Sequence, residues 1–276
     1  MNLLLATTVL LLARGAAPQV EGSVGVGGGY DSNVDLAPSS SALSSFGTST
    51  FSAWAELGAE LELSSAARLY AGVRYDGVLC PGATDLSRNV PGGELSLTYD
   101  FTDWLAVSAS PGLSYAFFGD PARSALQLNV AAVARVRPWR WLSLRAGYAR
   151  AQSWASAPVF SLALDRLLTS AEIRLARRTY LAVGYALSSG DQVFYRRLRA
   201  GGATGASGSR GHVGSGAFAQ LEAYQAGATE DEFSIRVEQG IWRELYVAAS
   251  YAYTLGSSVQ GSYTTQSGFG AVGYRF

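Results

Sequence analysis

Residues 51–63 have the sequence FSAWAELGAELEL, in which every odd position is apolar and most even positions are polar. Successive side chains of a β-strand point to opposite faces, so this stretch predicts a strand with one apolar face. Its other face carries Glu56, Glu60 and Glu62. A tilted strand needs about 9 to 11 residues to cross a bilayer. The stretch is therefore long enough to be a membrane-crossing strand.

Residues 126–137, LQLNVAAVARVR, repeat the pattern with basic residues on the polar side, among them Arg135 and Arg137. The same division recurs in six further stretches: 95–101, 105–115, 142–148, 181–187, 233–237 and 245–255. A soluble sandwich also alternates, but it turns its apolar faces toward a core. Here charges and glycine occupy the other face in strand after strand. The pattern favours lipid outside and a polar interior.

The composition agrees with an all-β membrane protein. Apolar residues make up 48% of the 276 residues and charged residues only 15%. Beyond the N-terminus, no apolar run approaches the roughly 18 residues that a membrane-spanning helix requires. Glycine (32), tyrosine (15) and tryptophan (6) suit short strands, tight turns and aromatic belts. We therefore predict one domain, a transmembrane antiparallel up-and-down β-barrel over residues 18–276.

The N-terminus resembles an export signal. Residues 3–13 form an apolar core of signal-peptide length, and small residues follow at positions suited to cleavage after Gly15 or Ala17. We predict a signal peptide over residues 1–17. Export and a barrel together place the mature chain in the outer membrane of a Gram-negative bacterium, in contact with its lipids.

The connections between strands are expected to alternate between short turns and long loops, as in outer-membrane barrels. Short turns are predicted at 64–67, 102–103, 138–140, 177–179 and 242–244, and longer loops at 32–46, 80–92, 118–123, 154–159 and 257–262. An indole can sit at the headgroup level of a membrane. Four tryptophans close to the short turns therefore predict a periplasmic aromatic girdle: Trp104, Trp139, Trp141 and Trp242.

The strand number depends on the Gly-rich region 190–229. If residues 193–200 and 218–224 both cross the membrane, the barrel has fourteen strands. If they only extend neighbouring strands above the membrane, it has twelve. The spacing slightly favours fourteen, and both numbers place the two chain ends in the periplasm.

Two motifs resemble known outer-membrane proteins. Val272, Tyr274 and Phe276 match the alternating apolar residues and final phenylalanine of the terminal strand that the barrel-assembly machinery reads. Residues 27–34, GGGYDSNV, look like the first strand of barrels from surface-lipoprotein assembly modifiers and exopolysaccharide export systems. The resemblance implies a porin-like barrel, with the assembly machinery and other envelope proteins as partners. The helical-repeat domain that such relatives often carry is missing from this sequence.

The inward charges form the candidate site. A charged side chain inside each strand implies water or a partner charge in the lumen. The predicted pore-lining residues divide by sign along the sequence. The acidic ones are Glu56, Glu60, Glu62, Glu94 and Asp100, and the basic ones are Arg135, Arg137, Arg145 and Arg174. We call these two groups the acidic and basic arcs of the lumen. Either the two arcs line an open channel, or they form an ion-pair network that fills a narrow barrel.

Other site types are not supported by the residues. Asp31, Asn33 and Asp35 alternate like calcium ligands, but no glycine and distal glutamate complete a calcium loop, so a polar turn is the better interpretation. His212, the only histidine, lies in a Gly-rich segment. Such a segment would hold a catalytic base poorly in place, so the sequence does not predict an enzyme. The single cysteine, Cys80, excludes an internal disulfide. The formal net charge of zero gives no indication of nucleic acid, and no cofactor or metal is expected.

Two functions fit these features. The first is a porin-like channel with a charged polar lumen for solute or polymer passage. The second is a non-conducting structural or interaction barrel that anchors a multi-protein envelope machine for export, adhesion or motility.

All 21 basic residues are arginine, a side chain suited to ion pairs and phosphate contacts.

Overall fold

The computed structural model describes residues 18–33, 47–197, 212–213, 221–259 and 261–276. The predicted signal peptide 1–17, Asp35 and most of the Gly-rich segment lie outside these residues. Thirteen strands are present in the described part: β1 (Gln19–Asp31), β2 (Thr48–Glu62), β3 (Ala67–Leu79), β4 (Arg88–Thr102), β5 (Leu105–Phe118), β6 (Ala125–Trp139), β7 (Leu142–Ala155), β8 (Ala163–Ala176), β9 (Thr179–Arg197), β10 (His212–Val213), β11 (Leu221–Trp242), β12 (Leu245–Ser258) and β13 (Gly261–Arg275).

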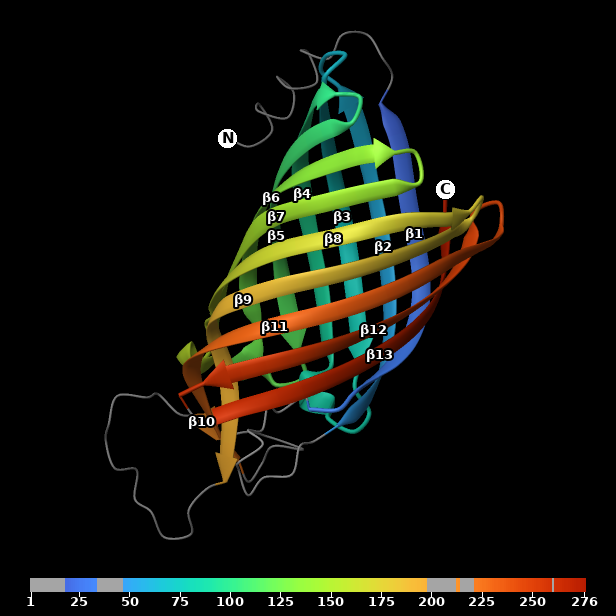
Figure 1. Ribbon diagram of the computed structural model, residues 1–276. Helices are drawn as coiled ribbons and strands as arrows, with labels where there is room; N and C mark the ends of the chain where they lie inside the picture. Colours follow the sequence, from blue (N-terminus) through green and yellow to red (C-terminus); the bar gives the residue numbers. More distant parts are fainter. Residues whose placement is uncertain (1–17, 34–46, 198–211, 214–220, 260) are drawn as a thin grey trace.

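The strands form a closed antiparallel barrel (Figure 1). Each strand pairs with its neighbours in sequence, β1 pairs with β13, and β9 pairs with β11 over nineteen residue pairs. Strand β10 is a two-residue extension beside β11 and does not take part in closure. Twelve of the described strands therefore make the wall. The twelve-strand alternative is the one adopted, because the chain on both sides of the Gly-rich region extends β9 and β11 instead of adding crossings.

The seam between the first and last strands includes the end of the chain. The backbone N–H of Gly22 donates to the carbonyl of Phe276, and the N–H of Phe276 donates to the carbonyl of Gly22, both at 3.0 Å. Val24 pairs with Tyr274 and Val26 with Val272. The residues predicted as the assembly signal therefore lie on the strand that closes the barrel, and their side chains belong to its outer face.

The outer face of the wall is apolar and exposed. Leu57 on β2 and Val73 on β3 are 49% and 61% exposed, and they pair with each other across the ladder. Comparable exposed residues follow around the ring: Leu95, Leu113, Val130, Leu144, Leu167, Val183, Ile235, Tyr251 and Val272. A continuous exposed belt of this kind is what a transmembrane barrel presents to lipid. The polar face predicted from the alternation points inward.

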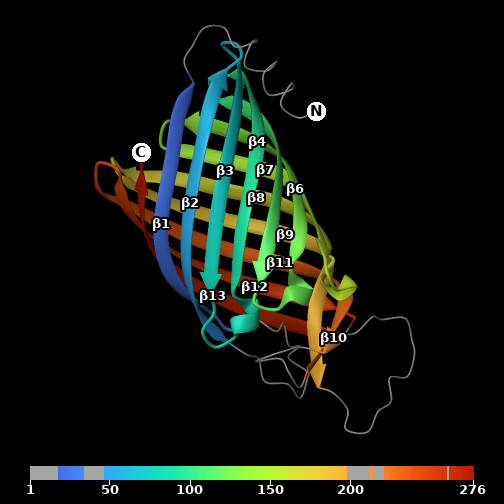
Figure 2. The same cartoon turned by 180° about the vertical axis from the view of Figure 1, so that it is seen from behind.

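The two ends of the barrel differ (Figures 1 and 2). At one end lie the chain's C-terminus, the start of β1 and five tight turns, which we call the short-turn end. The other end, the long-loop end, carries three 3-10 helices: η1 (Thr84–Leu86), η2 (Pro121–Arg123) and η3 (Pro158–Phe160). In outer-membrane barrels short turns face the periplasm and longer loops face outward. The long loop predicted at 257–262 is wrong in length, because β12 ends at Ser258 and β13 starts at Gly261.

None of the helices in the described ranges is long and apolar enough to span a membrane.

Candidate functional site: the lumen and its mouth

The acidic and basic arcs meet inside the barrel in a chain of ion pairs. Arg68 on β3 donates to Glu60 at 3.3 Å and to both carboxylate oxygens of Asp100, the nearer at 3.1 Å. Arg135 on β6 approaches the other side of Asp100 at 3.8 Å. These side chains are each about one third exposed, so water reaches them. Sequence reasoning missed Arg68, although it has the same inward register as the predicted residues.

Arg135 and Arg145 face each other directly. They are cross-strand partners in the β6–β7 ladder, and both point into the lumen. Arg145 has one carboxylate within ion-pair range, Glu172 at 3.6 Å. The structure thus brings together two of the four predicted basic residues.

The other predicted residues are more scattered. Glu56 accepts a hydrogen bond of 2.7 Å from the hydroxyl of Tyr70. Glu94 lies on β4 between Gly72 and Gly112 of the adjacent strands. Arg174 donates to the carbonyl of Arg177 in the β8–β9 turn. Glu62 and Arg137 lie near the short-turn end.

Two inward ion-pair groups were not predicted. Arg166 on β8 donates to Glu232 on β11 at 2.7 Å. Glu238 accepts from Arg236 and Arg275, and the Arg275 guanidinium lies 4.1 Å from the ring centre of Tyr246. Inward positions recur at every second residue of β11, and this alternation could have indicated that Glu232 and Glu238 point into the lumen. Their partners depend on the register between strands, which the sequence does not show.

Three cavities run along the basic side of the lumen. The middle one, of about 290 Å³, is lined by Thr98, Ala106, Ser108, Val133, Arg135 and Arg145. It shares Ala106 and Arg135 with a cavity of about 280 Å³ that reaches Thr102 and Trp104 at the short-turn end. It shares Val133 and Arg145 with one of about 330 Å³ beside Arg166 and Glu232. The three cavities therefore lie next to one another along the inner wall, from the short-turn end to Arg166 and Glu232.

Aromatic rings line the opposite wall. In the ring of twelve strands, β1 lies opposite β7, and Figure 2 shows β1 to β3 in front of β7 to β11. The inward side of β1 carries Gly25, Gly27 and Gly29. A β-carbon at Gly25 would overlap the indole of Trp54, and one at Gly29 would lie 2.9 Å from the ring of Phe269. The glycines let these two rings lie close against the wall instead of projecting far into the lumen.

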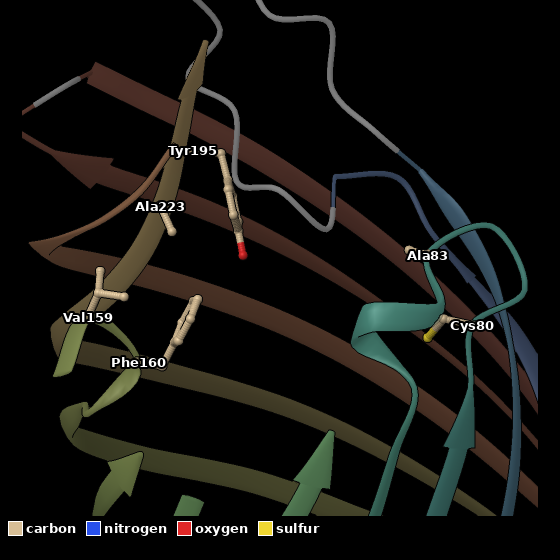
Figure 3. Packing of buried hydrophobic residues seen from close by; sticks show 6 residues of the cluster. All are labelled: Cys80, Ala83, Val159, Phe160, Tyr195 and Ala223. Carbon is tan, nitrogen blue, oxygen red and sulfur yellow. The ribbon is translucent and has the colours of Figure 1, made fainter. Parts of the chain in front are cut away.

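An apolar cluster lies at the mouth, at the long-loop end (Figure 3). This mouth cluster consists of Cys80, Ala83, Val159, Phe160, Tyr195 and Ala223. Its members come from both sides of the ring, because β3 and β4 lie opposite β9 and β11. Backbone hydrogen bonds join the three helical loops: Gly119 to Ser87, and Ala157 to Ala122. The packed loops therefore narrow the mouth.

Arg123 in η2 is a largely buried basic residue beside the mouth cluster. Its guanidinium lies 4.7 Å from the ring centre of Phe160 and 5.4 Å from that of Tyr195. Its side chain is only 11% exposed and pairs with Asp120 at 3.8 Å. Burial lowers the pKa of Arg123, but a guanidinium stays charged at ordinary pH. Cation–π contacts with two rings stabilise the charge there.

The aromatic residues mark two levels on the outer face. Trp104, Trp139, Trp141 and Trp242 are all at least half exposed beside the short turns, and the rings of Trp139 and Trp141 stack at 5.4 Å. Near the other end, outward tyrosines bond to polar groups. These pairs, which sequence reasoning missed, are Tyr75 with Asn89, Tyr148 with Asp165, Tyr185 with Asp231, and Tyr251 with Gln266.

The spacing of the two levels fits a membrane. Arg150 bonds Asp165, as Tyr148 does, and so lies at the level of the tyrosine pairs. From Trp141 to Arg150 the chain advances nine residues along β7. At about 3.3 Å per residue and a tilt of about 40°, this is roughly 23 Å along the membrane normal. The apolar band of an outer-membrane barrel is about 25 Å tall.

The predicted calcium-like loop behaves as a turn in its described part. The backbone N–H of Asn33 donates to the Asp31 carboxylate at 3.0 Å, and the Asn33 amide donates to the Thr264 carbonyl. No cluster of three or more histidine, cysteine or acidic ligands occurs among the described residues. His212 lies in β10, where its backbone pairs with Ala223.

A closed antiparallel barrel with an exposed apolar belt defines the class of this protein: it is a bacterial outer-membrane β-barrel. No protein-family model matches the sequence, and no curated protein matches it.

Solved structures of the same fold are similar to it. An outer membrane channel from Pseudomonas putida F1 aligns with 94% of this chain and 97% of its own at a TM-score of 0.61 and 11% identity. The NanC porin aligns with 91% of this chain and 98% of its own at 0.48 and 12% identity. A loop-deletion mutant of OmpT, an outer membrane protein of Vibrio cholerae, aligns with 94% of this chain and 99% of its own at 0.46 and 11% identity.

Proposed function

We propose that this barrel is a porin-like channel that passes small polar solutes through its charged lumen. The observation that supports the proposal is the row of three adjacent cavities from Thr102 and Trp104 at the short-turn end to Arg166 and Glu232. Side chains that filled the lumen completely would leave no such cavities along its wall.

The size of the barrel supports this function. Eight strands leave an interior just wide enough for side chains, whereas sixteen to eighteen leave an aqueous channel. Twelve strands lie between these limits. On the opposite wall, Trp54 and Phe269 pack over the inward glycines of β1, at positions where a β-carbon would clash with their rings.

The direct test is single-channel recording of the purified, refolded protein in a planar bilayer. We expect stable current steps in 1 M KCl of a size that fits a narrow pore. The folded state is checked independently by its faster migration in unheated gel electrophoresis. The channel is contradicted if the folded wild type and the folded Phe160→Ala variant, whose mouth is opened, both produce no current.

The mouth cluster favours a second candidate, the non-conducting barrel that anchors an envelope assembly. Six buried residues from opposite walls narrow the long-loop end, with Arg123 held between two rings. A barrel that only presents a rigid outer surface to partners needs no open mouth. The two functions are separated by Phe160→Ala, which removes the largest side chain of η3 from the mouth cluster. A channel gains current, and a structural barrel that is filled along its length stays silent.

A further inference from the structure

We propose that Arg135 and Arg145 form a binding site for the carboxylate or phosphate group of an anionic solute within the lumen. The proposal deepens the proposed channel function and rests on it, because it names the class of solute that the channel favours.

The first observation is the direct opposition of two like charges. Arg135 and Arg145 are cross-strand partners on neighbouring strands, and both side chains point inward. Like charges directly opposite each other in a sheet destabilise it. An anion that binds both guanidiniums removes this repulsion.

The second observation is the state of their donors. A guanidinium has five N–H donors, yet no hydrogen bond from either side chain is present in the described part of the chain. Their carboxylate contacts are long: 3.8 Å from Arg135 to Asp100, and 3.6 Å from Arg145 to Glu172. Asp100 is already bonded twice by Arg68.

Two other inward arginines differ in this respect. Arg166 bonds Glu232 at 2.7 Å, and Arg275 bonds Glu238 at 2.9 Å. Short, hydrogen-bonded pairs of this kind satisfy interior charges well. Arg135 and Arg145 instead face each other as a cross-strand pair with N–H donors left for a solute.

The third observation is the space in front of them. The two side chains line one cavity of about 290 Å³, together with the hydroxyl residues Thr98 and Ser108. Ser108 faces the cavity from β5 and donates weakly, at 3.5 Å, to the carbonyl of Val133. The cavity shares Ala106 and Arg135 with the cavity at the short-turn end. The two guanidiniums therefore lie on the short-turn side of the lumen, away from the mouth cluster at the long-loop end.

The chemistry of the lining selects oxyanions. Arginine binds carboxylate and phosphate groups in a planar, bidentate geometry, and hydroxyls donate to the remaining oxygens. Five arginines line the three cavities, against the acidic residues Asp100, Asp103 and Glu232. The lining is basic as a whole, and the cavity in front of Arg135 and Arg145 has no acidic residue in its lining.

The test uses the full barrel in detergent and inorganic phosphate, followed by acetate, as probes. Isothermal titration at constant ionic strength should show phosphate binding to the wild type. In Arg135→Gln/Arg145→Gln, the affinity should fall at least about tenfold, because two charge-assisted contacts are lost. The lysine double variant keeps both charges without the bidentate geometry and should bind with intermediate affinity. Acetate tests whether a carboxylate alone is sufficient.

The matched control is Arg150→Gln, which removes one arginine from the outward side of β7. Its phosphate affinity should equal that of the wild type. Titration does not require current, so the binding site and the channel can fail separately. Equal phosphate affinity in the wild type and the glutamine double variant, with both folded, overturns the site. Binding to the wild type without any conductance overturns the channel and leaves the site in place.

In bilayers the same variants should differ in ion selectivity. Under a KCl gradient the wild type should show a reversal potential toward the value for chloride, and the glutamine double variant should move toward the value for potassium. An unchanged reversal potential in the double variant contradicts the proposed position of the site in the conduction path.

Discussion

Gly29 and Phe269 are direct cross-strand partners at the β1–β13 seam, and the phenyl ring occupies the space where a β-carbon on Gly29 would lie. That β-carbon would be 2.5 Å from the carbonyl oxygen of Gly268 and 2.9 Å from the ring. The absence of a side chain at this position is therefore what lets the last strand close against the first.

We expect Gly29→Val to destabilise the folded barrel by about 1 to 3 kcal/mol, the usual cost of overpacking. The matched control is Gly28→Val on the outer face, where the nearest atom to a new β-carbon is 3.6 Å away. The measurement is the temperature at which the fast-migrating folded band disappears in gel electrophoresis. Equal losses in the two variants would show that the seam does not depend on this contact.

Phe160→Ala should open the mouth. Removing a buried aromatic side chain costs about 3 kcal/mol or more of packing free energy, so the mouth cluster should loosen. Single-channel current should rise. The control is Phe117→Ala, since Phe117 is exposed on β5 and lies outside the mouth cluster. A rise of the same size in both variants contradicts the assignment of the constriction.

Cys80 should react slowly in the folded protein. The residue is buried in the mouth cluster, and burial raises the pKa of its thiol. The thiolate is the form that reacts with maleimide. A thiol with a raised pKa has a smaller thiolate fraction at neutral pH than an ordinary cysteine, whose pKa is about 8.5. Maleimide labelling should therefore be slow at pH 7.5, rise only at more alkaline pH, and become fast after unfolding in urea.

The same reagent tests the mouth independently of current. In Phe160→Ala, labelling of Cys80 should accelerate without unfolding. Fast labelling of the folded wild type would contradict the packing of the mouth cluster.

Asp100→Asn should make the lumen more basic. Asp100 is the shared partner of Arg68 and Arg135, so its neutralisation leaves both guanidiniums with less compensation. The reversal potential should shift further toward anion selectivity. Asp165→Asn is the control, since it removes an outward carboxylate that pairs with Arg150. A shift toward cation selectivity in Asp100→Asn would contradict the role of this side chain in the lumen.

The fold could be predicted from the sequence because the alternation in residues 51–63 and 126–137 is regular over the length of a bilayer crossing. The strand number was harder, since β9 and β11 continue beyond the membrane with the same alternation and end in a Gly-rich segment. Sequence periodicity does not distinguish a crossing from an extension. Residues 257–262 show the same limit for loops, because polar residues there suggest a loop although β12 continues to Ser258 and β13 already starts at Gly261.

The site could be predicted only in part. Alternation predicts Arg135 and Arg145 on the inner side of the wall, but their direct opposition depends on the register between β6 and β7, which the sequence does not show. The pairing of Arg68 with Glu60 and Asp100 depends on register in the same way. The mouth cluster was missed because its apolar residues come from separate loops and show no period within any one of them.

One measurement tests directly which face of the wall meets lipid. Spin labels are placed singly at positions 130 to 137 of β6 in a Cys80→Ala background, with the protein in bilayers. Oxygen accessibility should peak at the positions of Val130, Ala132, Ala134 and Val136, and a water-soluble nickel reagent should peak at the alternate positions, among them Arg135. The opposite phase, with the valines shielded inside and the arginine at the lipid face, would contradict an apolar outer face that meets lipid.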